Sequence, residues 1–376
     1  MEDKLHIAAL IPYPVFPAKM GGQKGIALFY THLSRIAKLT LIGTADNLPP
    51  PELKESFIPA LSEKRSRYFD LSLIKKIGRI IRERQITHLI AEHPYYAWLV
   101  LMLKRTTGVK LIVHSHNIES LRFKNTGKWW WGIMWHYERS LHRAADLNFF
   151  ISDEDRRYAT KKFGLNRRKC ITITYGFELS STPSAAERAV CRKKLEETYG
   201  IDTSERILFF NGTLSYGPNL DALMTIVDKI NPILLEQNFS YKILICGKGL
   251  PDSFDKLKQY REKNIIYAGF VDDIGMLFKG SDIFINPVNG GGGIKTKLVE
   301  ALGFGLTCIS TRTGAIGVPA EITAGKLIVV GDGDIRGFAD AVISADVSEN
   351  IPPAFFEHFA WDNIVLKAKD AIINFT

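Results

Sequence analysis

The sequence predicts an α/β protein made of two domains, each with a parallel sheet covered by helices. Short apolar segments alternate with segments of helical spacing in both halves of the chain, which is the pattern of parallel strands joined by crossover helices. The length of 376 residues suits about two domains. A Ser-rich, small-residue stretch over 180–186 separates the halves. We therefore expect one domain over 1–180 and a second over 181–357.

The composition is that of an ordinary globular protein, with 46% hydrophobic and 24% charged residues. The net charge of +9 favours anionic partners such as nucleotides, anionic lipid surfaces or nucleic acid. No aromatic-basic sheet motif or basic recognition helix accompanies this charge, so we expect no nucleic-acid partner. The four cysteines are far apart and form no CxxC pair, which argues against a zinc site and fits a reducing compartment.

The ends and the hydropathy of the chain favour a cytoplasmic protein. The first residues, 1–4, do not form the basic segment of a signal peptide, because the next residues already have the pattern of a strand. No run of 18 or more apolar residues occurs, so we expect no transmembrane span.

Strands and helices alternate along the first half. Residues 5–12 are nearly all apolar, as expected of a strand buried in a parallel sheet. The Pro-rich stretch 48–59 is expected to be a loop. The other predicted strands are 39–43, 87–92, 111–117, 146–152 and 171–176, and the predicted helical segments are 26–37, 73–84, 95–104, 122–143 and a basic segment ending at Phe163.

A glycine loop follows the first strand. Gly21 and Gly22 precede the amphipathic segment 26–37, which gives a strand–glycine loop–helix unit. Backbone N–H groups at such a place can meet an anion or a sugar. The dinucleotide fingerprint GxGxxG is absent, and a tight loop without a ligand is the alternative.

Two histidines end the predicted strand 111–117. Ligands of doubly wound sheets bind beyond the carboxyl ends of the strands, where His114 and His116 are placed. Their spacing of two puts both side chains on one face of the strand. A catalytic or binding role for His116 competes with a purely structural, hydrogen-bonded role.

Four of the six tryptophans fall within seven positions. Trp131 and Met134 fit one buried helix face with later apolar residues, whereas Trp129 and Trp130 do not and lie beside Lys128. Aromatic residues interleaved with basic ones suit the interface of a membrane with anionic headgroups. We therefore predict a possible membrane surface at 128–130, with an aromatic helix packed under a loop as the alternative.

The second half restarts the strand–helix pattern. A strand is predicted at 206–213, and a turn at 216–219 leads into a helix over 220–235. Further strands are predicted at 241–249, 264–270, 281–287, 306–311 and 326–330. A helix is predicted to begin near Lys295, directly after four glycines.

The stretch 290–301 is the strongest candidate for a binding site. Its glycines allow the backbone to approach a ligand closely, and the helix that follows presents unpaired N–H groups with partial positive charge. Lys295 and Lys297 add two charges where they disfavour the helix itself, which a bound anion would explain. Glu300 shares the face of Lys297 and can accept hydrogen bonds from a sugar hydroxyl. Phosphate and hydroxyl together suggest a nucleotide.

The motifs of the second half resemble those of the group 1 (family 4-like) retaining glycosyltransferases of GT-B fold. The resemblance rests on motifs whose order and spacing match over roughly 205–320, and the first half matches more loosely. The matching motifs are Asn211-Gly212-Thr213, the turn 216–222, Gly247-Lys248-Gly249, 269–273, 290–301 and 314–317.

The resemblance implies two Rossmann-like domains that face each other across a cleft, with the helix near 361–373 crossing back so that 358–376 packs on the first domain. It implies a UDP- or GDP-sugar as donor and a glycan or lipid-linked acceptor, without a required cofactor. Glu300 matches the ribose-binding glutamate, Lys295 and Lys297 lie near the diphosphate, and His116 lies near the transferred sugar. The implied donor-binding residues are Gly21, Gly22, Asn211, Gly212, Thr213, Gly247, Gly291, Gly292, Gly293, Ile294 and Glu300.

Two positions depart from the better-known members of that family. Many relatives have a glutamate where this chain has Gly292, and many have an Arg and a Lys in the loop that here spans 212–219 and has neither. A glycine-rich branch shares both features. Contacts to the donor sugar and neutralisation of the phosphates must therefore differ.

Chemistry without a metal is expected, because lysines and a helix N-terminus can stabilise the charge of a leaving diphosphate. No DxD cluster stands out as a metal holder, and Asp272-Asp273 is the one alternative pair. No residue stands out as a covalent nucleophile, so anomeric retention is expected from the resemblance alone. The competing hypotheses are a nucleotide-sugar epimerase of the same fold and a non-catalytic protein that binds a nucleotide sugar or anionic lipid. Envelope polysaccharide or lipopolysaccharide synthesis, at the inner face of a membrane, is the expected setting.

Overall fold

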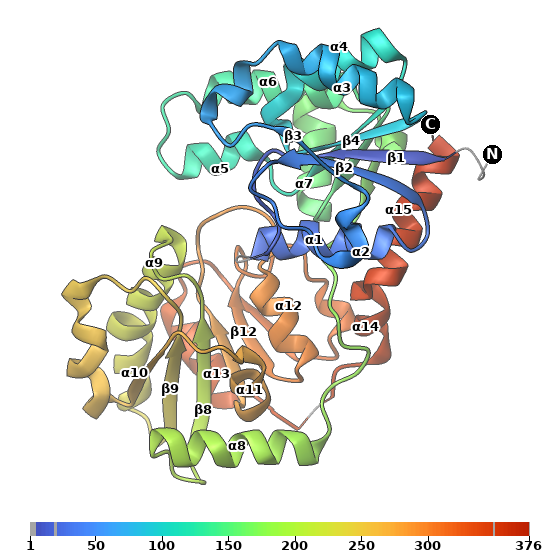
Figure 1. The fold of residues 1–376 in the computed structure, drawn as a ribbon. Helices are drawn as coiled ribbons and strands as arrows, with labels where there is room; N and C mark the ends of the chain where they lie inside the picture. The colour runs from blue at the N-terminus through green and yellow to red at the C-terminus, as the bar shows by residue number, and fades with distance from the viewer. Residues whose placement is uncertain (1–4, 19–20, 349, 376) are drawn as a thin grey trace. The chain divides into compact units, whose positions relative to one another are not determined.

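The computed structural model describes residues 5–18, 21–348 and 350–375. They form two compact units, which we call unit 1 (Met1–Glu178 with Phe359–Thr376) and unit 2 (Leu179–His358). Each unit is built on one sheet whose neighbouring strands all pair in parallel (Figure 1). The predicted class of two parallel α/β domains is confirmed.

The sheet of unit 1 has the strand order β3-β2-β1-β4-β5-β6-β7 within the described residues. The order reverses between β1 and β4, and such a switch point is where α/β proteins bind ligands. The strands are β1 (His6–Leu10), β2 (Lys38–Thr44), β3 (Phe57–Leu61), β4 (His88–Glu92), β5 (Lys110–Ser115), β6 (Leu147–Phe150) and β7 (Cys170–Thr172).

Helices cover both faces of this sheet. Residues of α3, α4 and α6 pack into one core cluster with β1, β2, β4 and β5. Figure 1 shows α1 on the opposite face, where it contacts α15. The helices are α1 (Gly21–Leu33), α2 (Pro51–Lys54), α3 (Ser72–Glu83), α4 (Ala97–Thr107), α5 (Glu119–Asn125), α6 (Trp131–Ala144), α7 (Asp153–Tyr158) with a π-helical continuation at Ala159–Gly164, and α15 (Trp361–Phe375).

The prediction of a loop over 48–59 is wrong, because α2 and the start of β3 lie there. Proline rarely occurs inside a sheet, since it has no N–H to donate. Pro59 is tolerated because β3 is the edge strand of unit 1 and pairs with β2 on one side. The stretch 122–143, in which a buried helix face was predicted from Trp131 onward, contains the end of α5 and most of α6, separated at Gly127, whose φ is +70°.

The sheet of unit 2 has the order β10-β9-β8-β11-β12-β13 within the described residues, with its switch point between β8 and β11. Its strands are β8 (Arg206–Asn211), β9 (Tyr241–Cys246), β10 (Ile265–Gly269), β11 (Ile283–Asn286), β12 (Thr307–Thr311) and β13 (Leu327–Val330). Its helices are α8 (Ala185–Tyr199), α9 (Gly217–Thr225) with a π-helical continuation at Ile226–Ile230, α10 (Asn231–Leu235), α11 (Ile274–Gly280), α12 (Thr296–Gly303), α13 (Ile335–Ser344) and α14 (Pro353–Phe359).

Helix α8 begins inside the Ser-rich stretch and was not predicted. Ser184 and Glu187 form a capping box, in which each side chain bonds to the backbone of the other residue. Only Leu195 of this helix is buried, so its sequence lacks the periodic apolar stripe that reveals most helices.

Helix α15 belongs to unit 1 although it ends the chain. Its first residue, Trp361, is 3% exposed and contacts Tyr175 edge to face. The indole also lies against Gly176, where a Cβ atom would approach ring carbons to 2.2 Å. The backbone pairs beside it, since the N–H of Phe177 donates to the carbonyl of Phe359 at 2.6 Å. These contacts hold α15 against the rest of unit 1.

Trp361→Ala should lower the free energy of unfolding by about 3–5 kcal/mol, because a large aromatic side chain is removed from a filled site. Leu366→Ala is the matched control on the same helix, since Leu366 is 50% exposed, and it should cost less than about 0.5 kcal/mol. Urea unfolding followed by circular dichroism measures both. Losses of the same size in the two variants would contradict this assignment of the packing.

Candidate active site

Apart from Gly21 and Gly22, the residues predicted to bind the donor belong to unit 2 and lie around its switch point. Strands β8 and β11 are neighbours there, and each ends in an asparagine, Asn211 and Asn286. The loop 212–219 follows β8, and the glycine stretch 290–293 follows β11 and leads into α12. Both asparagines keep a buried side-chain oxygen without a hydrogen-bond partner among the described residues.

Lys297, in the helix after the glycine stretch, forms hydrogen bonds at both ends of the loop 212–219. Its Nζ donates to the carbonyl oxygen of Asn211 and to Oδ1 of Asn219, each at 3.0 Å. The same ammonium lies 4.3 Å from the centre of the Phe210 ring. Its neighbours are therefore neutral dipoles and a ring, and no ion pair with a carboxylate is formed within the part of the chain described here.

This environment makes the Lys297 charge costly. Burial, and next the charge of Lys295, lower the pKa of Lys297 from 10.5 to about 7. A lysine that is desolvated and lacks a counter-ion is ready to bind an anion, because an incoming negative charge supplies the missing partner.

The glycine stretch is shaped by its neighbours. Gly291 and Gly293 have positive φ values of +83° and +62°, which favour glycine. A Cβ atom on Gly291 would lie 3.1 Å from the Tyr216 hydroxyl, so the loop after β8 covers this point. Lys295 precedes α12 and donates to the carbonyls of Gly292 and Gly293 at 3.3 and 3.0 Å.

Other predicted donor-side residues have clear packing roles. Gly247 must be glycine, because a Cβ atom there would lie 1.9 Å from the Gly212 carbonyl oxygen. Asn219 closes the loop by donating to the Thr213 carbonyl at 3.1 Å while its Oδ1 accepts from Lys297. These residues hold the loop that Lys297 contacts.

Two more predicted residues belong to helix α12 and its entry. Ile294 packs on Gly317, where a Cβ atom would come within 3.1 Å of the isoleucine. Glu300 is half-buried and follows Lys297 by one turn of α12. The structure thus brings Asn211, Lys295, Lys297 and Glu300 to one end of the unit 2 sheet.

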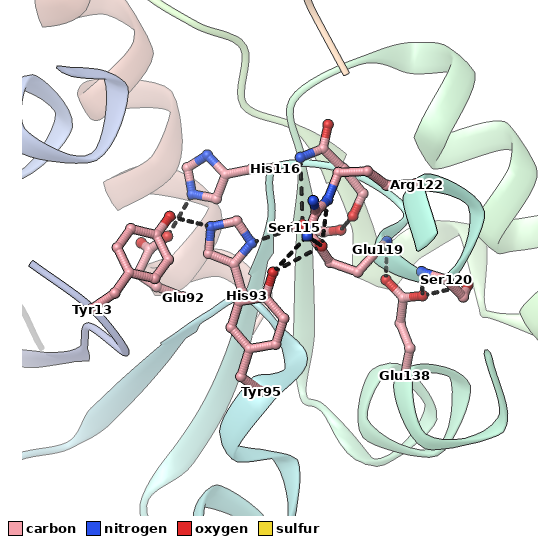
Figure 2. A network of polar contacts seen from close by, with 11 residues as sticks. Tyr13, Glu92, His93, Tyr95, Ser115, His116, Glu119, Ser120, Arg122 and Glu138 are labelled. Atoms are coloured by element: carbon pink, nitrogen blue, oxygen red, sulfur yellow. Dashed lines mark hydrogen bonds and ion pairs between the residues drawn. The ribbon is translucent and has the colours of Figure 1, made fainter. Parts of the chain in front are cut away.

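In unit 1, His114 and His116 meet at the carboxylate of Glu92, and Figure 2 shows His116 beside it. Glu92, the last residue of β4, is fully buried, and its Oε1 accepts from the Tyr30 hydroxyl and from His114 Nδ1 at 3.0 Å. Its Oε2 accepts from His116 Nε2 at 2.5 Å. Although burial alone would raise the pKa of Glu92, the two histidines hold it well below its usual range.

A second layer of polar residues, formed by Tyr13, His93, Glu119 and Arg122, lies next to this cluster. His93 stacks on His116 with ring centres 4.7 Å apart and has a positive φ of 63°, which is rare outside glycine. Its Nδ1 donates to Glu119 at 3.2 Å, and its Nε2 accepts from the Tyr13 hydroxyl at 2.7 Å, across the switch point between β1 and β4. Arg122 donates to Glu119 at 2.6 and 2.8 Å. Burial alone would raise the pKa of Glu119, but His93 and Arg122 lower it to about 2.

Glu138 of α6 fixes the start of α5 beneath this layer. Its carboxylate accepts from the backbone N–H groups of Glu119 and Ser120 at 2.8 and 3.0 Å and from the Ser120 hydroxyl at 2.7 Å. The first turn of α5 would otherwise leave these donors unpaired. Figure 2 shows the chain of contacts from Tyr13 to Glu138.

The glycine loop predicted before 26–37 is replaced by helix, since α1 already begins at Gly21. Gly21 and Gly22 therefore occupy its first turn. The side of Gly22 is open, because a Cβ atom there would meet nothing within 4 Å. Gln23 donates to the Pro14 carbonyl at 2.9 Å and holds the helix start to the segment after β1.

The three residues of the predicted membrane surface differ. Trp129 is 85% exposed and Lys128 is exposed, whereas Trp130 packs on the Phe123 ring with centres 4.4 Å apart. Ile133, one turn after Trp129, is 69% exposed and extends the apolar surface. None of the helices described here is both long enough and apolar enough to span a bilayer.

Two sets of side chains could be considered as metal ligands. Asp273 accepts from the backbone of Met276 at 3.3 Å and caps α11, so its carboxylate has a structural task. Glu92, His114 and His116 bring one possible ligand atom each within 4.8 Å. The hydrogen bonds of the Glu92 carboxylate account for that spacing without an ion.

Comparison with known proteins identifies the type of both units. A family model described as glycosyl transferases group 1 matches residues 205–345. A second, described as glycosyltransferase family 4, matches residues 33–181. The chain is a glycosyltransferase of GT-B fold.

Named relatives of this glycosyltransferase are distant. An uncharacterised 44.6 kDa protein in the cps region of Klebsiella pneumoniae is 21% identical over 313 residues, which is 78% of this chain and 71% of that protein. A chitobiosyldiphosphodolichol beta-mannosyltransferase of Debaryomyces hansenii is 24% identical over 285 residues, 70% of this chain and 58% of that protein. The Anabaena HepE structure with UDP and glucose has a TM-score of 0.70 at 14% identity, covering 98% of this chain and 100% of that one.

Sequence reasoning missed Glu92 and His93 of this glycosyltransferase. A signal for them existed, because both lie at the carboxyl end of a predicted strand, as His114 and His116 do. The pairing of β4 with β5, which sets Glu92 opposite His114, could not be read from the sequence.

Lys297→Met should change how the stability of the glycosyltransferase depends on pH. The unfolded chain keeps this proton up to about pH 10.5 and the folded chain releases it near pH 7, so unfolding takes up a proton between these values. The Lys297 contribution to the free energy of unfolding therefore rises with pH. The Met variant should gain most over the wild type near pH 7 and lose that gain toward pH 10.5. Denaturant titrations across this range measure the difference, and a constant difference would contradict the lowered pKa.

Proposed function

We propose that this glycosyltransferase is a retaining hexosyltransferase that moves a sugar from a nucleotide-diphosphate sugar, UDP- or GDP-linked, to a glycan or lipid-linked acceptor. Its setting would be the synthesis of cell-envelope polysaccharide or lipopolysaccharide. The protein would be cytoplasmic and peripheral at the inner face of the membrane.

The observation that carries the donor assignment is the ammonium of Lys297, a half-buried residue that lacks a carboxylate partner within the described residues. It lies at the start of α12, where the helix dipole adds positive potential. Lys295 adds a second charge beside it. A diphosphate is the ligand that matches two lysines and a helix N-terminus, and the HepE structure, which shares this fold, holds UDP.

The chemistry follows from where charge develops. Breaking the bond between sugar and diphosphate leaves negative charge on the diphosphate while the sugar becomes oxocarbenium-like. Lys295 and Lys297 would stabilise that charge, and a preorganised donor of this kind is worth roughly 3–4 kcal/mol in the transition state. Glu300 would bind the donor ribose, and His116 would contact the sugar. With two lysines present, the proposal requires no metal.

We infer the acceptor class from the names of two relatives and from the net charge of this chain. One relative is encoded in a cps region, and another carries the name of a dolichol-linked substrate, which is a lipid-linked glycan. The net charge of +9 favours an anionic membrane surface. Lys128, Trp129 and Ile133 would meet that surface, while Trp130 supports it from below through Phe123.

UDP or GDP should stabilise the wild type, by roughly 2.7 kcal/mol at about 100 times its Kd. Glu300→Ala should lose most of this gain, because a charge-assisted hydrogen bond contributes about 1.5–3 kcal/mol. Thermal unfolding with UDP, GDP, ADP and CMP measures the effect. Glu321→Ala, an exposed acidic position of the same unit, is the matched control and should respond as the wild type does.

Turnover assays with and without an acceptor separate this proposal from the two other hypotheses. An epimerase would convert a nucleotide sugar without an acceptor, whereas a transferase releases nucleotide in proportion to glycosylated acceptor. A binding protein would show the nucleotide shift and no turnover with any acceptor. If no nucleotide stabilises the wild type, the donor site proposed around Lys297 and Glu300 is wrong.

The double variant Trp129→Ala/Ile133→Ala should weaken binding to phosphatidylglycerol vesicles by about tenfold or more, since two exposed apolar side chains no longer enter the interface. Sedimentation with vesicles measures bound protein, and phosphatidylcholine vesicles test the need for anionic headgroups. Val190→Ala/Phe270→Ala removes two similarly exposed apolar side chains from unit 2 and is the control. Equal binding by both double variants would exclude this surface.

A further inference from the structure

The Glu92 carboxylate is placed between two imidazoles that differ in their second nitrogen. His114 is buried, and its Nε2 has no hydrogen-bond partner within the described residues. Aromatic rings of Phe29 and Phe149 lie next to it, with ring centres at 5.0 and 6.1 Å. A proton on this nitrogen would have no acceptor, so His114 serves Glu92 through one N–H only.

His116 differs because it reaches the surface of unit 1. Its side chain is 12% exposed, and Nε2 is held by Glu92 at 2.5 Å. Figure 2 shows the other ring nitrogen turned away from the carboxylate. The ring plane is set by His93, which stacks on it and is itself fixed at both nitrogens by Glu119 and Tyr13. The imidazole therefore has a fixed orientation and one nitrogen available on its outer side.

We propose that Glu92 is a positioning residue that keeps the Nε2 proton of His116 on its carboxylate and thereby presents the Nδ1 lone pair as an acceptor for a sugar hydroxyl. This inference rests on the proposed glycosyl transfer for its substrate. The arrangement of the protein groups can be tested without that function. A carboxylate that fixes the tautomer and orientation of a histidine is a recurrent device in enzymes.

Electrostatics supports this arrangement. Burial lowers the pKa of His116 below 6.5, so Nδ1 remains free of a proton at neutral pH. Glu92 stays ionised, and its charge offsets only part of this lowering of the His116 pKa. Within the described residues, the titratable groups that act on or contact His116 are Glu92 of β4, His93 after it, His114 of β5 and Glu119 of α5. Tyr30, Tyr13 and Arg122 contact Glu92, His93 and Glu119 in turn.

Glu92→Gln tests the proposal with almost no change of volume. The amide offers one oxygen where the carboxylate offers two, so it cannot accept from both histidines. We expect His116 to be the Nε2-protonated tautomer in the wild type and to shift toward the Nδ1-protonated form in the variant, as read by long-range nitrogen NMR on substrate-free protein. Turnover should fall by roughly a hundredfold or more, with the nucleotide Kd within about twofold of the wild type.

Glu119→Gln is the matched control, because Glu119 is equally buried and holds His93 rather than His116. It should leave the His116 tautomer unchanged. An Nδ1-protonated His116 in the wild type would overturn the proposal and needs no variant to be seen. Stoichiometric zinc or another divalent ion in the purified protein would also overturn it, because the three side chains would then be ligands.

The outcomes separate this inference from the proposed function. If no nucleotide binds but His116 shows the expected tautomer change, glycosyl transfer fails and the positioning role of Glu92 stands without its substrate. If nucleotide binding and turnover follow the proposal while Glu92→Gln keeps the wild-type tautomer and rate, only the role of Glu92 fails.

Discussion

The placement of Lys297 is the interaction on which the switch point of unit 2 depends. The residue is half-buried, and its ammonium contacts the Asn211 carbonyl, the Asn219 side chain and the Phe210 ring. Neutral dipoles compensate only part of the desolvation of a full charge. Nζ of Lys297 joins α12, which follows β11, to the loop after β8. The same ammonium favours a negative ligand.

This placement puts a positive charge beside the loop that lacks Arg and Lys. The loop 212–219 would carry cations in the better-known relatives, and here Lys297 of α12 contacts Asn211 and Asn219 at its two ends. A positive charge therefore occupies the same neighbourhood but comes from a helix. A side chain on a helix that is held by two hydrogen bonds loses less freedom on binding than one on a loop, which favours preorganisation.

How far the sequence predicts the molecule depends on the range of the interactions. The buried strands were evident, because parallel strands covered on both faces are nearly continuous apolar runs, as in β1 and β8. Strand β3 was missed because Pro59 is compatible only with an edge, and edge position is a property of the sheet. Helix α8 was missed because it buries a single leucine. Glycine, lysine and glutamate of α12 are close in sequence and were predicted as one group, whereas Glu92, His93, His116 and Tyr13 come from three segments.

The glycine at 292 fits this electrostatic arrangement. A glutamate there would place a carboxylate beside Lys295, whose ammonium contacts the carbonyls of Gly292 and Gly293. Such a pair would neutralise part of the positive potential at the start of α12. Without it, no carboxylate at position 292 competes with an anion for the two lysines. In unit 1 the polar groups at the switch point have the opposite character, since a buried carboxylate is surrounded by imidazole and hydroxyl donors. The switch point of unit 2 therefore favours an anion, whereas that of unit 1 fixes imidazole rings around a buried carboxylate.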